Sequence, residues 1–258
     1  MTTLMTGSPH AILIHGAWQG SWVWRDFAPL LEKAGFTPHA IDLPGNGADD
    51  TPLADVGLDL YLAHIGALIE QLEGDILIIA HSGGGVVGTA LGELYPQRIN
   101  SITYIAGMMM PSGWHFGDVL REEKAEERRL LGIGPYLEWN EARTVSWVPA
   151  RAGAQIFLND MPFDVALKGA ENLTPQAEPG RALKTDWTEE RFGSTPRIYV
   201  ECAQDLSVML PIQQAMQKLV PDARRIALDV GHAPHVSQPT VLADALIPEL
   251  MKAVQVTV

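Results

Sequence analysis

The most constraining feature of this chain is a run of buried-type apolar residues that breaks at a serine flanked by small residues. Residues 75–80 have the pattern of a buried strand, and residues 83–88 continue as a segment that can form a helix. Ser82 stands at the break, inside the sequence Ala-His-Ser-Gly-Gly from Ala80 to Gly84. A strand, a tight turn and a helix in this order hold a serine out at the carboxyl end of a sheet, where a helix dipole favours negative charge. Ser82 is therefore a candidate nucleophile, and Ala80 and Gly84 are small because the turn leaves no room for larger side chains.

A serine hydroxyl is a weak nucleophile until a histidine accepts its proton and a carboxylate orients that histidine. Two strand-like runs late in the chain, 197–203 and 224–230, are followed by Asp205 and by His232. Serine, then acid, then histidine, with each partner on a loop after a strand, is the expected order for a nucleophile elbow on an α/β sheet. We therefore predict a catalytic triad of Ser82, Asp205 and His232.

Three other residues compete for these roles. Glu201 lies inside its predicted strand and Asp229 at the end of the next, so neither stands on the turn from which an acid would reach the histidine. His235 is an alternative base, and we prefer His232 because it comes first after the strand and its glycine. The His-x-x-His spacing also resembles a metal motif. No zincin glutamate follows it and no third ligand is spaced nearby, so we predict no metal site.

Ester chemistry of this kind also needs two backbone N–H groups where a carbonyl oxygen becomes negative. Gly83 would supply one of them. The loop after an early strand normally supplies the other, and here residues 11–14 are followed by His15, Gly16 and Ala17. Gly16 would let the backbone approach the substrate, and Ala17 would donate its N–H. We predict an oxyanion hole of Ala17 and Gly83.

These motifs make the chain resemble the α/β-hydrolases, and among them the branch of plant methylesterases and hydroxynitrile lyases with its bacterial relatives. The segments that carry the resemblance are His15–Trp24, Ile41–Gly45, Ala80–Gly84, Phe157–Asp160, Cys202–Asp205 and Gly231–His232 with Pro239. The resemblance extends over nearly the whole chain. It implies an α/β-hydrolase fold, with a mostly parallel central sheet flanked by helices, and the same triad.

Two positions distinguish the reaction types within this branch. The lyases that the chain resembles carry a threonine where it has Gly16, and a lysine where it has Ala233. Without that lysine a departing cyanide has no cationic stabiliser, and without the threonine the cyanohydrin hydroxyl loses a partner. Ester hydrolysis is therefore the favoured reaction.

The domain organisation follows from the strand spacing. Further strands are predicted at 38–42 and 101–107, and the stretch from 109 to 196 that follows is too long for a single crossover helix. We predict one domain over residues 1–258 with an inserted helical cap at about 109–196. Helices are expected over 119–131, where the charges would form a solvated face, and over 162–172.

The cap composition bears on the substrate. Polarisable and aromatic side chains there suit an apolar or aromatic group better than a sugar or a phosphate. The candidate substrate-binding residues are Trp18, Met108, Trp114, Trp139 and Trp147. Core packing is the alternative role for each of them taken singly.

Composition limits the remaining possibilities. The chain has 258 residues, 47% of them hydrophobic, which is enough for one domain with a large core. Its formal net charge of −13 disfavours nucleic acid, an anionic membrane surface and a polyanionic substrate. With a single cysteine, Cys202, and no signal-like or membrane-spanning segment, a cytoplasmic protein is expected.

The sequence thus predicts a carboxylesterase-type serine hydrolase that acts on a small, apolar or aromatic ester through an acyl-serine and needs no cofactor. Its only expected partner is the small-molecule substrate, and homodimerisation stays open. A lactone or a thioester would be cleaved by the same groups. A small-molecule receptor that retains the triad is the alternative outside enzymology.

Overall fold

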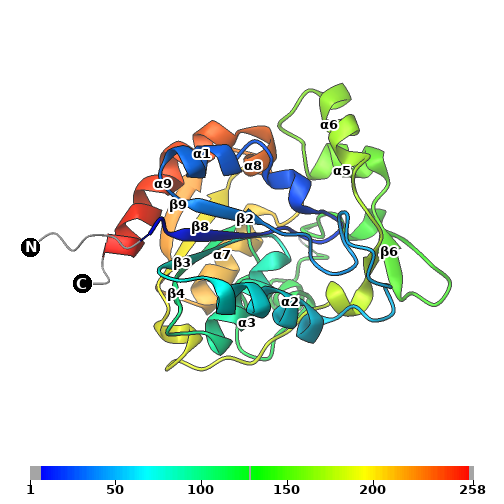
Figure 1. Ribbon diagram of the computed structural model, residues 1–258. Helices are drawn as coiled ribbons and strands as arrows, with labels where there is room; N and C mark the ends of the chain where they lie inside the picture. The colour runs from blue at the N-terminus through cyan, green and yellow to red at the C-terminus, as the bar shows by residue number, and fades with distance from the viewer. Residues whose placement is uncertain (1–6, 128, 256–258) are drawn as a thin grey trace, which may run out of the picture.

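The structure is a computed structural model that describes residues 7–127 and 129–255. Its centre is a six-stranded sheet in the order β2-β1-β3-β4-β8-β9, in which every neighbouring pair is parallel. Helices cover both faces of this sheet, with α1, α8 and α9 on one side and α2, α3 and α7 on the other (Figure 1). This arrangement confirms the predicted fold class.

The sheet strands are β1 (His10–Ile14), β2 (Thr37–Ala40), β3 (Ile76–His81), β4 (Ile99–Ile105), β8 (Arg197–Cys202) and β9 (Arg224–Leu228). The helices packed on it are α1 (Ala28–Lys33), α2 (Leu58–Gln71), α3 (Gly84–Leu94), α7 (Leu210–Leu219), α8 (Pro234–Ser237) and α9 (Pro239–Gln255), with the short 3-10 helix η1 (Ser21–Trp24) before α1. All six strands were predicted, and their ends differ from the prediction by at most a few residues.

The strands are apolar on both faces because each face is covered. Ile12, Ile14 and Ile78 pack into a core shared with α2, α3 and α7. Leu13 and Leu77, which alternate with them along the same strands, pack into a second core with α1 and α9. Alternation of side chains across a strand explains the division, and burial of both faces explains the continuous apolar runs.

Much of the segment between β4 and β8, including α5, α6 and β6, stands at the end of the molecule opposite the two termini, and its last residues run back to the start of β8 (Figure 1). It contains the helices α4 (Phe116–Glu122), α5 (Ala150–Ile156) and α6 (Phe163–Ala170) and the 3-10 turns η2 (Gly134–Tyr136), η3 (Glu178–Gly180) and η4 (Phe192–Ser194). It also contains an antiparallel three-stranded sheet of β5 (Glu138–Trp139), β6 (Val145–Trp147) and β7 (Gln176–Ala177), which the sequence did not predict. We refer to this segment as the cap.

The predicted helix over 119–131 is wrong in its extent. Helix α4 begins earlier, where the side chains of His115 and Asp118 form a capping box, and it ends at Glu122. Lys124 takes a positive φ of 49°, and the N–H of Ala125 bonds back to the carbonyl of Leu120. This is a Schellman termination, and it turns Ala125 into the core. The helix predicted over 162–172 is present as α6, and Arg128 lies outside the described residues.

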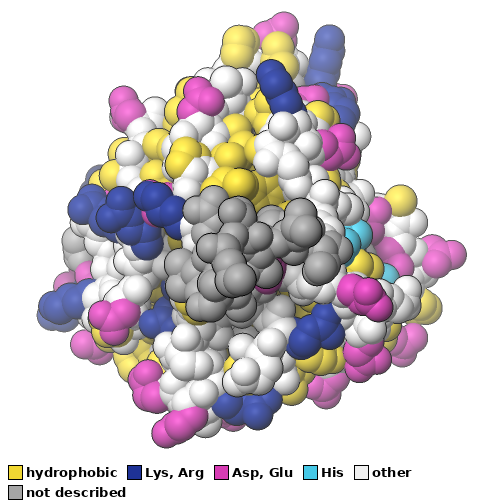
Figure 2. Space-filling view, turned by 60° about the vertical axis from the view of Figure 1, so that its left-hand side comes forward, with side chains coloured by type: hydrophobic (Ala, Val, Ile, Leu, Met, Phe, Trp, Pro, Cys, Tyr) yellow, Lys and Arg dark blue, Asp and Glu magenta, His cyan; other side chains and the backbone are white. Residues whose placement is uncertain are grey.

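The face that carries both termini shows acidic and basic side chains mixed with exposed apolar ones (Figure 2). Within the described residues, no helix combines the length and apolar character needed to cross a membrane.

Candidate active site

The turn between β3 and α3 holds Ser82 in a backbone conformation that few non-glycine residues adopt. Its φ is 50°, its N–H donates to the carbonyl of Ile105, and its own carbonyl accepts from the N–H groups of Gly85 and Met108. These backbone bonds fix the strained residue in place. β1 and β3 are neighbours in the sheet although β2 lies between them in sequence, so Ser82 stands at the point where the strand order reverses. Such switch points are the usual ligand sites of open α/β sheets.

Two glycines next to Ser82 are required by close contacts. A Cβ atom on Gly84 would lie 2.5 Å from the carbonyl oxygen of His15 and 3.0 Å from that of Ile14, at the end of β1. A Cβ atom on Gly16 would lie 3.0 Å from the Cβ atom of Ser82. The elbow and the loop after β1 therefore pack directly against each other.

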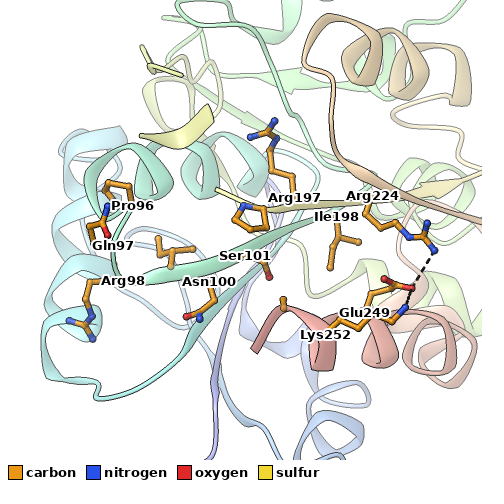
Figure 3. Close-up of a pocket in the computed structure, with 13 residues that line it drawn as sticks. Pro96, Gln97, Arg98, Asn100, Ser101, Arg197, Ile198, Arg224, Glu249 and Lys252 are labelled. Carbon is orange, nitrogen blue, oxygen red and sulfur yellow. Dashed lines mark hydrogen bonds and ion pairs between the residues drawn. The ribbon is translucent and has the colours of Figure 1, made fainter. Parts of the chain in front are cut away.

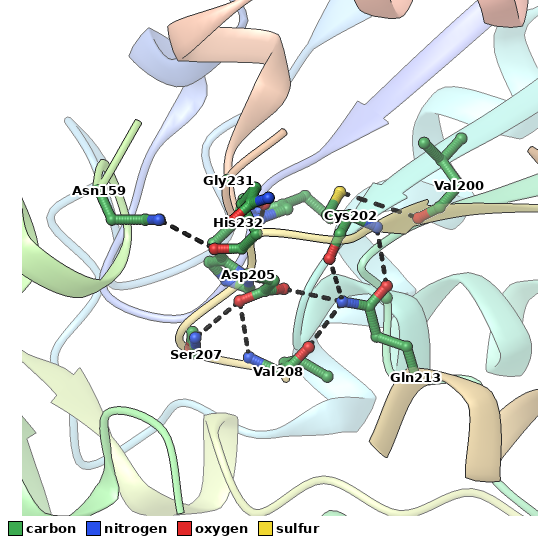
Figure 4. A network of polar contacts seen from close by, with 12 residues as sticks. Asn159, Val200, Cys202, Asp205, Ser207, Val208, Gln213, Gly231 and His232 are labelled. Atoms are coloured by element: carbon green, nitrogen blue, oxygen red, sulfur yellow. Dashed lines mark hydrogen bonds and ion pairs between the residues drawn. The ribbon is translucent and has the colours of Figure 1, made fainter. Parts of the chain in front are cut away.

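His232 and Asp205 are brought together by the loops after β9 and β8. Nδ1 of His232 lies 2.7 Å from Oδ2 of Asp205, and both side chains are buried. The Asp205 carboxylate also accepts from the N–H groups of Ser207 and Val208, and from Nε2 of Gln213 (Figure 4). The carboxylate is thus held in one orientation, with one oxygen directed at the histidine.

The competing residues do not form such a pair. Glu201 is engaged by Arg225 of β9 at 2.7 Å and by Gln217 of α7 at 2.8 Å. Asp229 is exposed and accepts from the side chain of Gln204. His235 is fully buried, and neither of its ring nitrogens has a hydrogen-bond partner among the described residues. Only His232, of the two candidate bases, therefore has a carboxylate partner in the described structure.

His81, the residue before Ser82, links the elbow to the histidine loop. Its Nε2 lies 3.0 Å from the carbonyl oxygen of His232, and the two imidazole rings are in contact with centroids 4.6 Å apart. Burial, and then the neighbouring His235 and His232, lower the pKa of His81 well below its ordinary value. A neutral imidazole can donate from Nε2 to this carbonyl, so the contact joins β3 to the loop that carries His232.

The predicted oxyanion donors stand side by side. A Cβ atom on Gly83 would lie 3.7 Å from the backbone nitrogen of Ala17. Within the described part of the chain, no hydrogen bond is formed by the N–H of either residue. Both residues line the same cavity as Ser82. Two backbone N–H groups are therefore available next to the serine.

That cavity has a volume of about 310 Å³ and lies between the elbow and the cap. Most of its wall is apolar, and it includes Trp18 and Met108 from the predicted substrate-binding set. The other apolar lining residues are Ala17, Phe116, Leu120, Leu131, Ile133, Leu137, Ala182 and Val208.

The other three predicted substrate-binding residues are not among the described residues that line this cavity. Trp114 packs against the core formed with α2, α3 and α7. Trp147 is on β6 and donates from Nε1 to the carboxylate of Glu138 at 2.6 Å. Trp139, on β5, lies under the guanidinium group of Arg181, 5.4 Å from its ring centroid. Two of these three tryptophans thus belong to the cap sheet that the sequence did not predict.

Arg181 and Glu178 supply the paired charges in the cavity wall. Nε and Nη2 of Arg181 donate to the two carboxylate oxygens of Glu178, each at 2.7 Å. Trp18 and Trp139 both face the guanidinium group, with centroids at 6.0 and 5.4 Å. Neither charged residue was predicted from the sequence, because residues in and next to the 3-10 turn η3 of the cap carry no local signal of their position near Ser82.

His15 braces the oxyanion loop. Its Nδ1 lies 2.8 Å from the carbonyl of Gly16, and its Nε2 accepts from the N–H of Leu43 at 3.0 Å. Burial lowers the pKa of His15 to about 4, although the Gly16 carbonyl acts in the opposite direction. The neutral form satisfies both contacts, since one nitrogen donates and the other accepts.

A second cavity, of about 530 Å³, lies at the amino ends of β4 and β8, away from Ser82. Its charged lining residues are Arg98, Arg197, Arg224, Glu249 and Lys252. Glu249 pairs with Arg224 at 3.5 Å and with Lys252 at 2.9 Å (Figure 3). The cavity holds no histidine, and ligands of parallel sheets bind at the carboxyl ends of the strands. We therefore place the candidate site at Ser82. Among the described residues, no group of three or more His, Cys, Asp or Glu side chains could hold a metal ion.

Comparison with known proteins agrees with this geometry. The profile of the "Alpha/beta hydrolase family" matches residues 11–245. The chain belongs to this family. Among solved structures, this α/β-hydrolase is similar to polyneuridine aldehyde esterase, with a TM-score of 0.80, 21% identity, and coverage of 95% of this chain and 99% of that one.

Its curated relatives include plant methylesterases. Salicylic acid-binding protein 2 of Nicotiana tabacum is 31% identical over 219 residues, which cover 79% of this chain and 82% of that protein. Methylesterase 9 of Arabidopsis thaliana is 24% identical over 247 residues, which cover 92% and 96% of the two chains. These relatives support an esterase-type α/β-hydrolase, which confirms the resemblance drawn from the sequence motifs.

Proposed function

We propose that this carboxylesterase-type hydrolase cleaves small, uncharged carboxylic esters through an acyl intermediate on Ser82. The observation that carries the proposal is the sharing of one cavity by Ser82 and the two backbone N–H groups of Ala17 and Gly83. The buried His232–Asp205 pair on the neighbouring loops supplies the base and its orienter.

In the proposed first step, Oγ of Ser82 attacks the ester carbonyl and its proton passes to Nε2 of His232. The carbonyl oxygen becomes negative and accepts hydrogen bonds from the backbone N–H groups of Ala17 and of Gly83, which is the N-cap residue of α3. The carbon–oxygen bond to the alcohol then breaks, and His232 returns the proton to the leaving alcohol. Asp205 stabilises the imidazolium that forms between these two events.

In the second step a water molecule attacks the acyl-serine carbonyl and gives one proton to His232. The bond to Ser82 breaks, Oγ regains its proton from the imidazolium, and the carboxylic acid is released. No other reactant is needed, because ester and water together balance acid and alcohol.

The cavity supports the proposed substrate class. A volume of about 310 Å³ with a largely apolar wall suits a small aliphatic or aromatic group. The charges of Arg181 and Glu178 cancel within their ion pair, so the wall presents polarity without net charge. Lactones and thioesters of the same size fit the same mechanism.

A purified enzyme assayed on a panel of p-nitrophenyl acyl esters, aryl methyl esters and lactones tests the proposal. Wild type should turn over at least one class repeatedly and be labelled by a fluorophosphonate probe. Ser82→Ala should lose labelling and lower kcat by about 10⁴-fold or more while keeping its fold, since the change removes the attacking oxygen and little volume. Labelling that persists in Ser82→Ala would refute the assignment of the nucleophile.

A small-molecule receptor is the second candidate, and its support is the name of the 31% identical relative, which describes a salicylic acid-binding protein. Slow turnover of every substrate, together with tight binding of an aryl carboxylic acid, would favour this alternative. Rapid multiple turnover of a simple ester would favour the enzyme.

A further inference from the structure

The loop between α5 and α6 leaves the cap and reaches the loops that carry the acid and the base. Four residues, Phe157 to Asp160, make up this part of the loop. They come from the middle of the chain, whereas Asp205 and His232 come from its last quarter. No step of the proposed mechanism uses them.

Asn159 contacts the acid loop. Its Nδ2 donates to the carbonyl oxygen of Gln204 at 2.9 Å, on the residue directly before Asp205. Figure 4 shows the Asn159 side chain pointing from the cap toward the loops of the triad. The backbone N–H of Gln204 also donates to the carbonyl oxygen of Val230, in the segment that leads to His232. Gln204 therefore connects the acid loop to the base loop.

Asp160 contacts the base loop. Its Oδ2 accepts from the backbone N–H of Gly231 at 2.8 Å, on the residue directly before His232. The same oxygen accepts from the side chains of Ser237 and Gln238, each at 2.9 Å, at the end of α8. Three donors on one carboxylate oxygen make this a charge-assisted and directional contact.

Gly231 is the residue that permits this approach. A Cβ atom there would lie 2.6 Å from Oδ1 of Asp160 and 2.8 Å from Oδ1 of Asn159. No L side chain larger than hydrogen fits without moving one of the two cap residues. The contact between the cap and the base loop is thus specified on both sides.

Phe157 completes the contact on the histidine itself. Its ring centroid lies 5.4 Å from that of His232, and it stacks at 6.1 Å on Trp18 in the cavity wall. One short loop therefore touches the base ring, the residue before the base and the residue before the acid.

We infer that Asn159 and Asp160 are positioning residues that set the alignment of Asp205 and His232 relative to Ser82, an inference that rests on the proposed function. Asn159 holds the backbone of the residue before Asp205, and Asp160 holds the backbone of the residue before His232. A small displacement of either loop would move Nε2 of His232 relative to Ser82. A misplacement of about 1 Å lowers the rate of a positioned reaction by on the order of 100-fold. Binding of the substrate in the cavity does not involve either side chain, since neither lines it.

The test compares Asn159→Ala and Asp160→Ala with wild type on the best ester of the panel. Both should lower kcat by about 10- to 100-fold and change KM by less than about 2-fold. Asp160→Asn, which keeps an acceptor oxygen, should recover most of the loss. Asn172→Ala is the matched control, because Asn172 also donates to backbone carbonyls in the cap but at the exposed end of α6. It should leave both constants unchanged.

Two further readouts separate alignment from folding. Fluorophosphonate titration counts the competent sites, so the fall in kcat should persist per labelled site. The proton NMR resonance of His232 Nδ1–H, which reports its hydrogen bond to Asp205, should shift or broaden in Asn159→Ala and not in Asn172→Ala. If Asp160→Ala fails to fold, Asn159→Ala and this resonance decide.

A wild-type value of kcat in folded Asn159→Ala and Asp160→Ala would overturn the inference. So would a fall in kcat that fluorophosphonate titration explains entirely by a smaller number of competent sites. A change confined to KM would overturn it as well. Failure of the proposed function looks different: wild type itself would neither turn over esters nor be labelled. In that case the His232 resonance still tests the alignment, because it needs no turnover.

Discussion

Nδ1 of His232 lies 2.7 Å from Oδ2 of Asp205, in a place where neither side chain is exposed to solvent. A carboxylate only accepts, so Nδ1 must carry the proton and donate it to this contact. Nε2 of the neutral ring is then the unprotonated nitrogen. The pair therefore fixes the tautomer that a serine nucleophile requires.

The first prediction removes this tautomer control. Asp205→Asn should lower kcat by roughly 10⁴-fold with little change in stability, because an amide can donate to Nδ1 and favour the wrong tautomer. His232→Ala should be impaired at least as severely. Steady-state kinetics on the best ester, with circular dichroism to check folding, measure both.

Asp229→Asn and His235→Ala are the matched controls, since they change the same residue types in the same part of the chain. Asp229 is exposed, and His235 contacts no carboxylate among the described residues, so both variants should keep substantial activity. A reversed ranking would require the acid and base roles to be reassigned to these two residues.

The parts of this site that the sequence predicted are those with local signals. Ser82 follows an apolar strand and precedes small residues, and Asp205 and His232 each follow a strand, so their positions at one edge of a parallel sheet were predictable. The positioning contacts of Asn159 and Asp160 were not. They depend on where the cap loop returns to the sheet, and no periodicity in residues 157–160 encodes that return.

The end of α4 shows a second limit of sequence reasoning. Residues 119–131 are rich in good helix formers, yet the helix ends at Glu122. Like charges at Glu122 and Glu126, and at Glu123 and Glu127, are spaced four apart and would repel on a continuous helix. The burial of Ala125 in the core then favours termination, and this tertiary contact is invisible in the pattern.

The second prediction concerns stability at acid pH. Burial lowers the pKa of His15 to about 4, and it lowers the pKa values of His81 and His235 well below their ordinary range. As pH falls below about 6.5, the unfolded chain takes up protons that the folded chain does not. The free energy of unfolding should therefore be unaffected by these groups above that pH and decrease steadily from there toward pH 4. Thermal or urea unfolding measured from pH 8 to pH 4.5 checks this.

His235→Phe isolates one of these groups. The ring of His235 stacks on Trp24 with centroids 4.3 Å apart, and both of its nitrogens are buried without partners in the described structure. Phenylalanine keeps the stacking and removes two unsatisfied polar atoms, so it should stabilise the fold by about 1–3 kcal/mol at neutral pH. It should also reduce the acid slope by about 1.4 kcal/mol per pH unit. His64→Gln, at an exposed position, is the control and should change neither the stability at neutral pH nor the acid slope. An unchanged acid slope in His235→Phe would contradict the prediction.

The third prediction tests charge selection by the cavity wall. Glu178→Gln leaves the guanidinium group of Arg181 without its carboxylate partner. The ratio of kcat/KM for an ester with an anionic acyl group, such as p-nitrophenyl hemisuccinate, to that for p-nitrophenyl butyrate should rise about 10-fold, which corresponds to about 1.4 kcal/mol. Glu249→Gln is the control, because it frees Arg224 and Lys252 at the opposite end of the sheet. Equal ratios in the two variants would show that Arg181 does not face the bound acyl group.

The last prediction concerns the choice between hydrolysis and cyanohydrin cleavage. The lyases that this chain resembles carry a hydroxyl side chain at the position of Gly16 and a lysine at that of Ala233. Here Ala233 is fully buried, and a Cβ atom on Gly16 would lie 3.0 Å from both Nδ1 of His81 and Cβ of Ser82. A threonine at position 16 therefore does not fit unless the elbow moves, and no cation stands at position 233 to stabilise a departing cyanide.

Wild type should hydrolyse p-nitrophenyl acetate or butyrate and release no measurable cyanide from mandelonitrile or acetone cyanohydrin. Gly16→Thr should lower esterase activity through the collision with Ser82 and gain no lyase activity. Cyanide release that exceeds ester hydrolysis in wild type would show that neither the hydroxyl nor the cation is needed.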